Sequence, residues 1–230
     1  MYYIDPVYIL ISLPALLIGI TAQLLVKYFY NKYNNVANSS RITGAEVAER
    51  FAKDYGLNIK LKISLSRLSD NYNPINRVLT LSDEVARRPS IASIGISAHE
   101  LGHVLQHKKG SILVGIRNLI APVVNLGSTL GYIIFLIGLS LQIFGAVIAG
   151  IVLFSLSTLF TIITLPIEID ASIKAVNMIK RTGILEEYEM NGVKKVLLAA
   201  SITYVAAVMQ SVSTLLYYVF RAVGIRKRRS

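Results

Sequence analysis

The five-residue motif His99-Glu100-Leu101-Gly102-His103 is the part of this chain whose residue types and spacing could do chemistry. Residues four apart lie on one face of a helix, so the two imidazoles can close on a single Zn²⁺. Glu100 is rotated by about 100° from His99, which places its carboxylate beside the metal rather than on it. There it can take a proton from a water that the metal has acidified. The motif therefore predicts a zinc site with His99 and His103 as ligands and Glu100 as general base.

A catalytic zinc ion usually has three protein ligands and a water, so the motif leaves one ligand to be found. One class of metallopeptidase extends the motif with Gly at position 106 and His at position 109. This chain has Gln106 and Lys109 at those positions, which excludes that class. His107 lies about 12 Å along the helix axis from His99, and we expect it to be a polar residue at the helix end. The third ligand is then expected to be a carboxylate from elsewhere in the chain.

Glu168 is the best candidate for that carboxylate. It follows a long uncharged stretch that can return the chain to the side it left at Arg117. Asp170 is the nearby alternative. Either residue could instead be a charge in the first turn of a helix, where the helix dipole favours it. A further group of acids, which we expect to form a solvated surface, comprises Glu186, Glu187 and Glu189.

The composition excludes several classes of protein. The chain has 230 residues, of which 53% are hydrophobic and 16% charged, and this excludes a disordered chain and disfavours a soluble globule. The absence of Cys excludes disulfides, cysteine-ligated zinc and a thiol nucleophile. The net charge of +11 suggests nucleic acid or anionic lipid as a partner. Because the charges flank apolar stretches rather than forming a stripe, we expect a lipid bilayer and no nucleic acid.

Three uncharged stretches are long enough to cross a bilayer, whose core takes about 20 helical residues. Residues 118–167 have room for two helices, near 118–139 and 144–165, with a turn at 140–142. We therefore predict a mainly α, integral-membrane fold with about four transmembrane helices and a small α+β zincin-like block. The expected parts are transmembrane helix 1 (1–28), the soluble block (29–117), a transmembrane hairpin (118–167), a polar segment with the third metal ligand (168–195), transmembrane helix 4 (196–220) and a basic tail (221–230).

Four crossings place both polar blocks on one side of the membrane and both termini on the other. Most of the 24 Lys and Arg residues lie in the polar blocks, so the positive-inside rule predicts a multi-pass cell-membrane protein with its catalytic side in the cytoplasm. The basic run at residues 226–229 favours the opposite orientation. Arg77, Arg87 and Arg88 could face anionic lipid or substrate carboxylates, although solvated surface is the commoner role for such residues.

The soluble block begins with a helix signal. Thr43 and Glu46 match a capping box, and Gly56 is placed to end the helix that follows. Alternating apolar and polar residues then predict strands, and a run rich in Asn, Asp and Ser predicts a turn. The expected order is a half-buried strand at 59–65, a turn at 69–76, a second strand at 77–81 and a helix from Pro89 to about His107.

The hydrophobic hairpin followed by Leu165-Pro166-Ile167-Glu168-Ile169-Asp170-Ala171-Ser172 resembles the YugP-like family of membrane zinc metallopeptidases. The runs at residues 72–74, 81–82, 194–197 and 203–207 are also similar to that family, and the resemblance extends over nearly the whole chain. More distantly, the layout is similar to the HtpX and CAAX-prenyl-protease group, which carries a metal-binding Glu after a membrane hairpin.

This resemblance implies a gluzincin-type zinc peptidase in which His99, His103 and Glu168 bind the metal and Glu100 is the catalytic base. The HtpX-like pattern has Asp four residues after the ligand Glu, where Ser172 stands here. Ser172 and Asp170 are therefore the candidates for orienting the metal ligands.

The leading hypothesis is an integral-membrane zinc metalloendopeptidase that hydrolyses membrane or membrane-proximal polypeptides. Tyr72 and Tyr204 are candidates for stabilising the oxyanion, although the role of an interfacial aromatic is favoured for each. The strand at 77–81 precedes the metal helix, and as an edge strand it could pair with an extended peptide substrate. The alternative is a non-catalytic membrane scaffold that holds zinc, which the presence of Glu100 disfavours.

Overall fold

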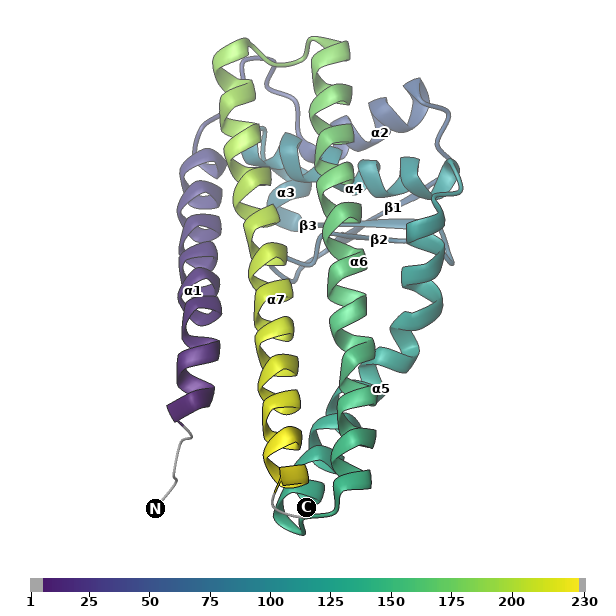
Figure 1. Cartoon of the computed structure of the whole chain (residues 1–230). Helices are drawn as coiled ribbons and strands as arrows, with labels where there is room; N and C mark the ends of the chain where they lie inside the picture. Colours follow the sequence, from purple (N-terminus) through teal and green to yellow (C-terminus); the bar gives the residue numbers. More distant parts are fainter. Residues whose placement is uncertain (1–5, 228–230) are drawn as a thin grey trace. The chain divides into compact units, whose positions relative to one another are not determined.

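The computed structural model describes residues 6–227, so residues 1–5 of the first predicted transmembrane segment and residues 228–230 of the predicted basic tail lie outside the described residues. Within the described part, seven helices and three strands follow one another along the chain (Figure 1). The chain divides into two compact units. We call residues up to Thr21, 115–166 and from Thr203 onward the hairpin unit, and residues 22–114 and 167–202 the sheet unit.

The hairpin unit draws its residues from four long apolar helices. Of these, α1 (Pro6–Asn34), α6 (Phe144–Thr182) and most of α7 (Glu187–Lys227) are each long and apolar enough to cross a membrane. The two parts of α5 (Ile112–Ser140) meet at 46° and together meet the same criterion. Pro122 lies near this bend, and a proline removes a helical hydrogen bond and kinks the helix. The described residues therefore support three or four membrane helices.

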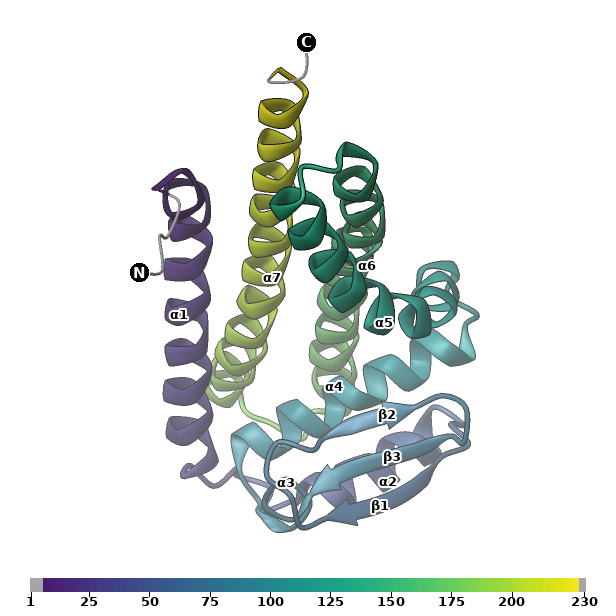
Figure 2. The same ribbon diagram turned by 90° about the horizontal axis from the view of Figure 1, so that it is seen from below.

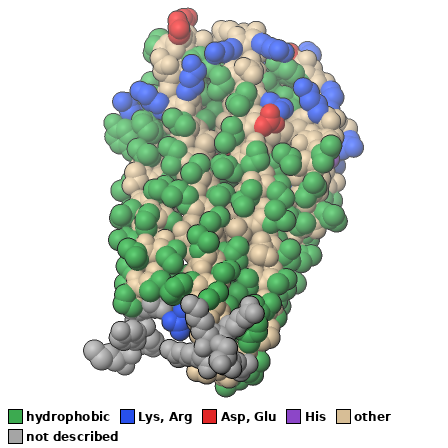
Figure 3. All heavy atoms as spheres, viewed as in Figure 1, with side chains coloured by type: hydrophobic (Ala, Val, Ile, Leu, Met, Phe, Trp, Pro, Cys, Tyr) green, Lys and Arg blue, Asp and Glu red, His purple; other side chains and the backbone are tan. Residues whose placement is uncertain are grey.

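The surface of the hairpin unit suits lipid better than water. Hydrophobic side chains cover the long helices on the face drawn in Figure 3. Leu10 and Leu119 are each 77% exposed, and Leu126 is 70% exposed. Soluble proteins rarely expose contiguous apolar surface on this scale, whereas a bilayer covers it. Inside the unit, α5 and α6 pack closely, because a Cβ on Gly131 would lie 3.0 Å from the carbonyl oxygen of Gly150.

The sheet unit begins as the sequence predicts. The helix α2 (Gly44–Asp54) has the expected capping box, in which the Thr43 amide donates to the Glu46 carboxylate at 2.7 Å. Three short strands follow, β1 (Lys60–Ser64), β2 (Asn71–Asn73) and β3 (Val78–Ser82), and they lie side by side in the order β1, β3, β2 (Figure 2). The β3 strand runs parallel to β1 and antiparallel to β2.

Two predictions about this sheet are wrong. Residues 69–76 do not form only a turn, because β2 lies within them and pairs with β3. The strand predicted at 77–81 corresponds to β3, which is the central strand and not an edge. Its two sides are occupied by β1 and β2, so its backbone cannot add an extended peptide. The edge strands are β1 and β2, and of these only β2 runs antiparallel to the central strand.

Glu189 is fully buried, contrary to the predicted solvated surface, whereas Glu186 and Glu187 are exposed as expected. The Glu189 carboxylate accepts hydrogen bonds from the Ser39 amide at 2.6 Å, the Ser39 hydroxyl at 2.7 Å and the Glu186 amide at 2.8 Å. It therefore caps the first turn of α7 and holds the loop before α2 against it. The core beneath these elements includes Val47, Phe51, Leu79, Leu81, Leu101, Ile179 and Val193.

Candidate metal centre

The helix α4 (Ile91–Lys108) carries the His-Glu-x-x-His motif and closely matches the predicted bounds. Ser90 is its N-cap, and its hydroxyl accepts a hydrogen bond from the Ser93 amide at 3.1 Å. Leu101 is fully buried in the core, whereas the side chains of His99 and His103 remain 15% and 16% exposed. The apolar face thus sets the rotation of α4 and turns both imidazoles to the same side.

Glu168 reaches the motif on α6, which crosses α4 at close range. Gly102 allows this approach, because a Cβ at that position would lie 2.5 Å from the carbonyl oxygen of Ala171. The helix α6 begins at Phe144 and continues through Pro166, so Glu168 is not a charge in the first turn of a helix. Its side chain is only 4% exposed. A carboxylate buried to this extent needs a charged partner or a metal.

The candidate ligand atoms converge on one point in the sheet unit. Oε2 of Glu168 lies 3.3 Å from Nε2 of His99 and 3.5 Å from Nε2 of His103. All three residues offer ligand atoms that lie within 4.8 Å of one another. Two ligands bound tetrahedrally at about 2.0–2.1 Å would be about 3.4 Å apart, which agrees with the two contacts to Glu168. The donor set and its spacing therefore fit a zinc ion.

The contacts made by the Nδ1 atoms of His99 and His103 also favour zinc binding. Nδ1 of His99 lies 3.1 Å from the Ser172 hydroxyl, and Nδ1 of His103 lies 3.0 Å from Oε1 of Gln106. The Gln106 amide nitrogen donates to the Ile167 carbonyl at 2.7 Å, so its oxygen must face the imidazole as an acceptor. His103 then carries its proton on Nδ1, which leaves Nε2 free to bind a metal.

Asp170, predicted as a candidate for orienting the ligands, does not contact a candidate metal ligand directly but lies one hydrogen bond further away. Its carboxylate accepts a hydrogen bond from the Gln106 amide at 2.8 Å and forms an ion pair with Lys174. Asp170 can therefore influence His103 only through Gln106, whereas Ser172 contacts His99 directly. Gln106 was missed in the sequence, and the only available signal was a polar residue three positions after His103 on a mostly apolar helix.

The electrostatic surroundings of Glu100 differ from those of His103. Burial raises the pKa of the Glu100 carboxyl, and the neighbouring His99 and His103 only partly offset this. Burial alone would lower the pKa of His103, but the carboxylates of Glu168 and Glu100 outweigh it and raise the pKa. Glu100 is thus a carboxyl that holds a proton readily, while His103 faces negative charge where a cation would be bound.

The two tyrosines predicted as oxyanion candidates have different surroundings. Tyr72 lies on β2, and its hydroxyl is 2.9 Å from Nδ1 of His107 in the last turn of α4. Burial raises the pKa of the Tyr72 hydroxyl, so it stays protonated and able to donate a hydrogen bond. His107 thus holds Tyr72 rather than joining the metal cluster. Tyr204 lies on α7 within the hairpin unit, and its assignment stays a prediction.

The long apolar helices and the His₂Glu cluster define a membrane protein with a site suited to zinc. Residues 8–223 match the model of the family described as "Putative neutral zinc metallopeptidase". The chain is 39% identical over 213 residues to a Bacillus subtilis (strain 168) protein named "Putative membrane protease YugP", covering 92% of this chain and 95% of that protein. The chain belongs to this zinc metallopeptidase family. No solved structure matches it significantly.

Proposed function

We propose that this protein is an integral-membrane zinc metalloendopeptidase of the gluzincin type. The observation that carries the proposal is the convergence of His99, His103 and Glu168 from two helices beside the buried carboxylate of Glu100. A structural zinc site has no use for a general base, which disfavours the alternative of a zinc-holding scaffold.

Each residue has a distinct part in the proposed hydrolysis. A zinc ion held by the three ligands would polarise the scissile carbonyl and lower the pKa of a water. Glu100 accepts the proton of the attacking water and transfers it to the nitrogen of the leaving amine. Ser172 and Gln106 keep the two imidazoles oriented throughout. Tyr72 is a candidate donor to the oxyanion, together with Tyr204.

The expected substrates are membrane or membrane-proximal polypeptides. Glu168 is the first charged residue after the uncharged run at 118–167, so its helix brings the site close to the membrane boundary. The edge strand β2 contacts α4 and offers a backbone with which an extended peptide could pair. The polar blocks and the site are proposed to face the cytoplasm, in keeping with the distribution of Lys and Arg.

The decisive experiment compares the wild type with Glu100→Gln. Each protein, purified in detergent, is assayed for bound zinc and for cleavage of an unfolded protein substrate, with and without a chelator. We expect both to hold zinc and only the wild type to cleave, with activity lost on chelation. Glu49→Gln, which removes the same charge from an exposed position on α2, is the matched control and should cleave normally.

Other outcomes would count against the proposal in different ways. Zinc in both proteins with no cleavage by either, across several unfolded substrates, would favour the zinc-holding scaffold. Equal cleavage by wild type and Glu100→Gln would show that the activity comes from another protein in the preparation.

A further inference from the structure

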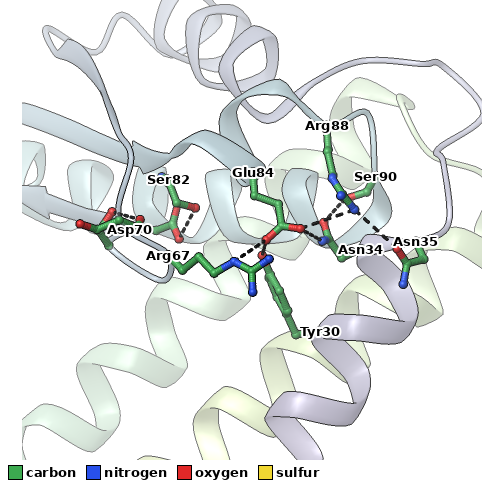
Figure 4. Close-up of polar contacts among 11 residues, drawn as sticks. Tyr30, Asn34, Asn35, Arg67, Asp70, Ser82, Glu84, Arg88 and Ser90 are labelled. Atoms are coloured by element: carbon green, nitrogen blue, oxygen red, sulfur yellow. Dashed lines mark hydrogen bonds and ion pairs between the residues drawn. The ribbon is translucent and has the colours of Figure 1, made fainter.

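A cluster of charged side chains outside the metal centre joins α1 to α3 (Asp83–Arg87) (Figure 4). Glu84 lies at its centre and accepts hydrogen bonds from the Asn34 side-chain amide at 2.8 Å and the Tyr30 hydroxyl at 3.1 Å. Arg88 approaches the same carboxylate at 3.5 Å and Arg67 at 4.0 Å. Burial alone would raise the pKa of Glu84, but these partners outweigh it and lower the pKa, so Glu84 stays ionised.

Beside this cluster is a hollow of about 310 Å³ that is rich in arginine. Arg67 and Arg87 are 87% and 70% exposed, and Arg88 is 49% exposed. Arg87 pairs with Asp83 at 2.6 Å. Three arginines are matched by three carboxylates, Glu84, Asp83 and Asp70, of which Asp70 accepts hydrogen bonds from the Ser82 amide and hydroxyl. The guanidinium groups are nevertheless the most exposed charges at the hollow, because Asp83 and Glu84 are only 45% and 19% exposed. The lining includes Leu65, Ser66, Arg67, Asp83, Arg87 and Arg88.

The position of Tyr30 on α1 places one side of the Glu84 cluster at the level of lipid headgroups, with Asn34 just outside that layer. The uncharged run of α1 ends at Val26, and Tyr30 lies four residues further along the same helix. At 1.5 Å per residue this is about 6 Å beyond the end of the apolar run, and Asn34 is about 12 Å beyond it. The headgroup layer begins at the edge of the hydrocarbon core and is about 5–8 Å thick on each side.

Two large apolar side chains accompany the arginines. Leu65 is 92% exposed and Leu68 is 72% exposed, and both lie in the loop between β1 and β2 on either side of Arg67. A single exposed leucine is ordinary on a protein surface. Two that flank an exposed arginine at headgroup depth form the pattern of an interfacial anchor, in which apolar tips enter the acyl boundary and cations meet phosphates.

We propose that Arg67, Arg87 and Arg88, with Leu65 and Leu68, form a docking site for anionic phospholipid that holds the β1–β2 loop on the bilayer surface. The occupant is a membrane lipid because the site combines exposed guanidinium groups with exposed apolar side chains beside a helix long and apolar enough to span a membrane. Asn34 also accepts a hydrogen bond from Ser90, the N-cap of α4, at 3.2 Å. The docked loop is therefore linked to the helix that carries the metal motif.

The test measures lipid binding to the full chain in a neutral detergent. Phosphatidylglycerol or phosphatidylcholine is titrated and the bound lipids are resolved by native mass spectrometry. Wild type should prefer phosphatidylglycerol. A cation near an anionic lipid contributes roughly fivefold to binding, so Arg67→Gln with Arg87→Gln should weaken phosphatidylglycerol binding by about 5- to 25-fold. The matched control, Arg50→Gln with Lys53→Gln, removes the same charge from exposed positions on α2 and should have little effect.

A second pair of variants separates a lipid from a free anion. Leu65→Ser with Leu68→Ser keeps every charge and should also weaken phosphatidylglycerol binding, while inorganic phosphate should not displace the lipid. The single variant Arg67→Gln is included because its position is 87% exposed and we expect the change not to disturb folding. Circular dichroism checks the folding of every variant. Equal binding by wild type and both arginine variants, or equal binding of the two lipids, would overturn the proposal. Displacement by phosphate with no effect of the leucine changes would reassign the site to free phosphate.

Discussion

At the scale of single residues, Gln106 determines which nitrogen of His103 can bind a metal. Its amide nitrogen is used by the Ile167 carbonyl and the Asp170 carboxylate, so its oxygen can only accept from His103. Gln106 is 2% exposed, and no water is needed to complete this network. The side chain therefore acts as a rigid support for one ligand of the proposed zinc ion.

We predict that Gln106→Ala lowers zinc affinity by about 10- to 100-fold, the usual cost of losing an outer partner of a metal-bound His. The variant leaves His103 free to rotate and to carry its proton on either nitrogen. Zinc affinity would be measured by competition with a chromophoric chelator at constant pH. Circular dichroism of the metal-free protein serves as a check on folding. An unchanged affinity in a folded variant would show that Gln106 does not orient His103.

At this scale the sequence predicts which candidate ligands come together but not what surrounds them. His99 and His103, the proposed ligands, follow from a spacing that a helix converts into a shared face. Ser172 was found through its place in a motif, and the structure puts its hydroxyl against His99. Gln106 belongs to no spacing rule, because its role depends on where α6 places Ile167 and Asp170. A contact between two helices distant in sequence is not visible in either one alone.

At the scale of elements, the crossing of α4 and α6 is what assembles the candidate site. Gly102 lies between the two histidines of the motif, and Ala171 lies three residues after Glu168. Because the backbones meet at these two positions, any side chain on Gly102 would separate the helices that carry the proposed ligands.

We predict that Gly102→Ala destabilises the protein by about 1–3 kcal/mol, the usual cost of overpacking, and also weakens zinc binding. The added Cβ would lie 2.5 Å from a backbone oxygen that cannot move without shifting α6. Gly115→Ala in α5 is the control, since a Cβ there meets no atom within 4 Å. It should be neutral or stabilising by up to about 1 kcal/mol. Thermal unfolding with chelator and zinc stoichiometry would test both, and equal behaviour of the two variants would contradict the prediction.

The features that sequence patterns missed depend on surroundings that a local pattern does not contain. Two of the three residues in Asn71-Tyr72-Asn73 are asparagines, which favour turns over strands, and the segment becomes β2 because β3 offers it a partner. Proline at 166 suggests a helix boundary, yet α6 continues through it, as membrane helices can. Glu189 looks solvated beside two other acids until the Ser39 loop folds over it. The capping box of α2, in contrast, is local and was predicted in detail.

At the scale of the whole molecule, α1, α6 and α7 each contribute residues to both units. Residues 144–166 of α6 belong to the hairpin unit, and residues 167–182 belong to the sheet unit. The proposed third ligand therefore sits just past the apolar part of a candidate membrane helix. A zinc site built in this way depends on the membrane helices for its geometry, so we expect a substrate to reach it near the bilayer and not in bulk solvent.

The membrane orientation can be tested with cysteines, because the chain has none of its own. Glu49→Cys on α2 and Leu141→Cys in the α5–α6 turn are both exposed and are separated along the chain by the candidate membrane span of α5. If the polar blocks are cytoplasmic, a membrane-impermeant maleimide should label Leu141→Cys in intact cells and Glu49→Cys only after permeabilisation. The reversed pattern would place the metal site outside the cell, as the basic run at residues 226–229 favours. Labelling of both positions from the same side would mean that α5 does not cross the bilayer.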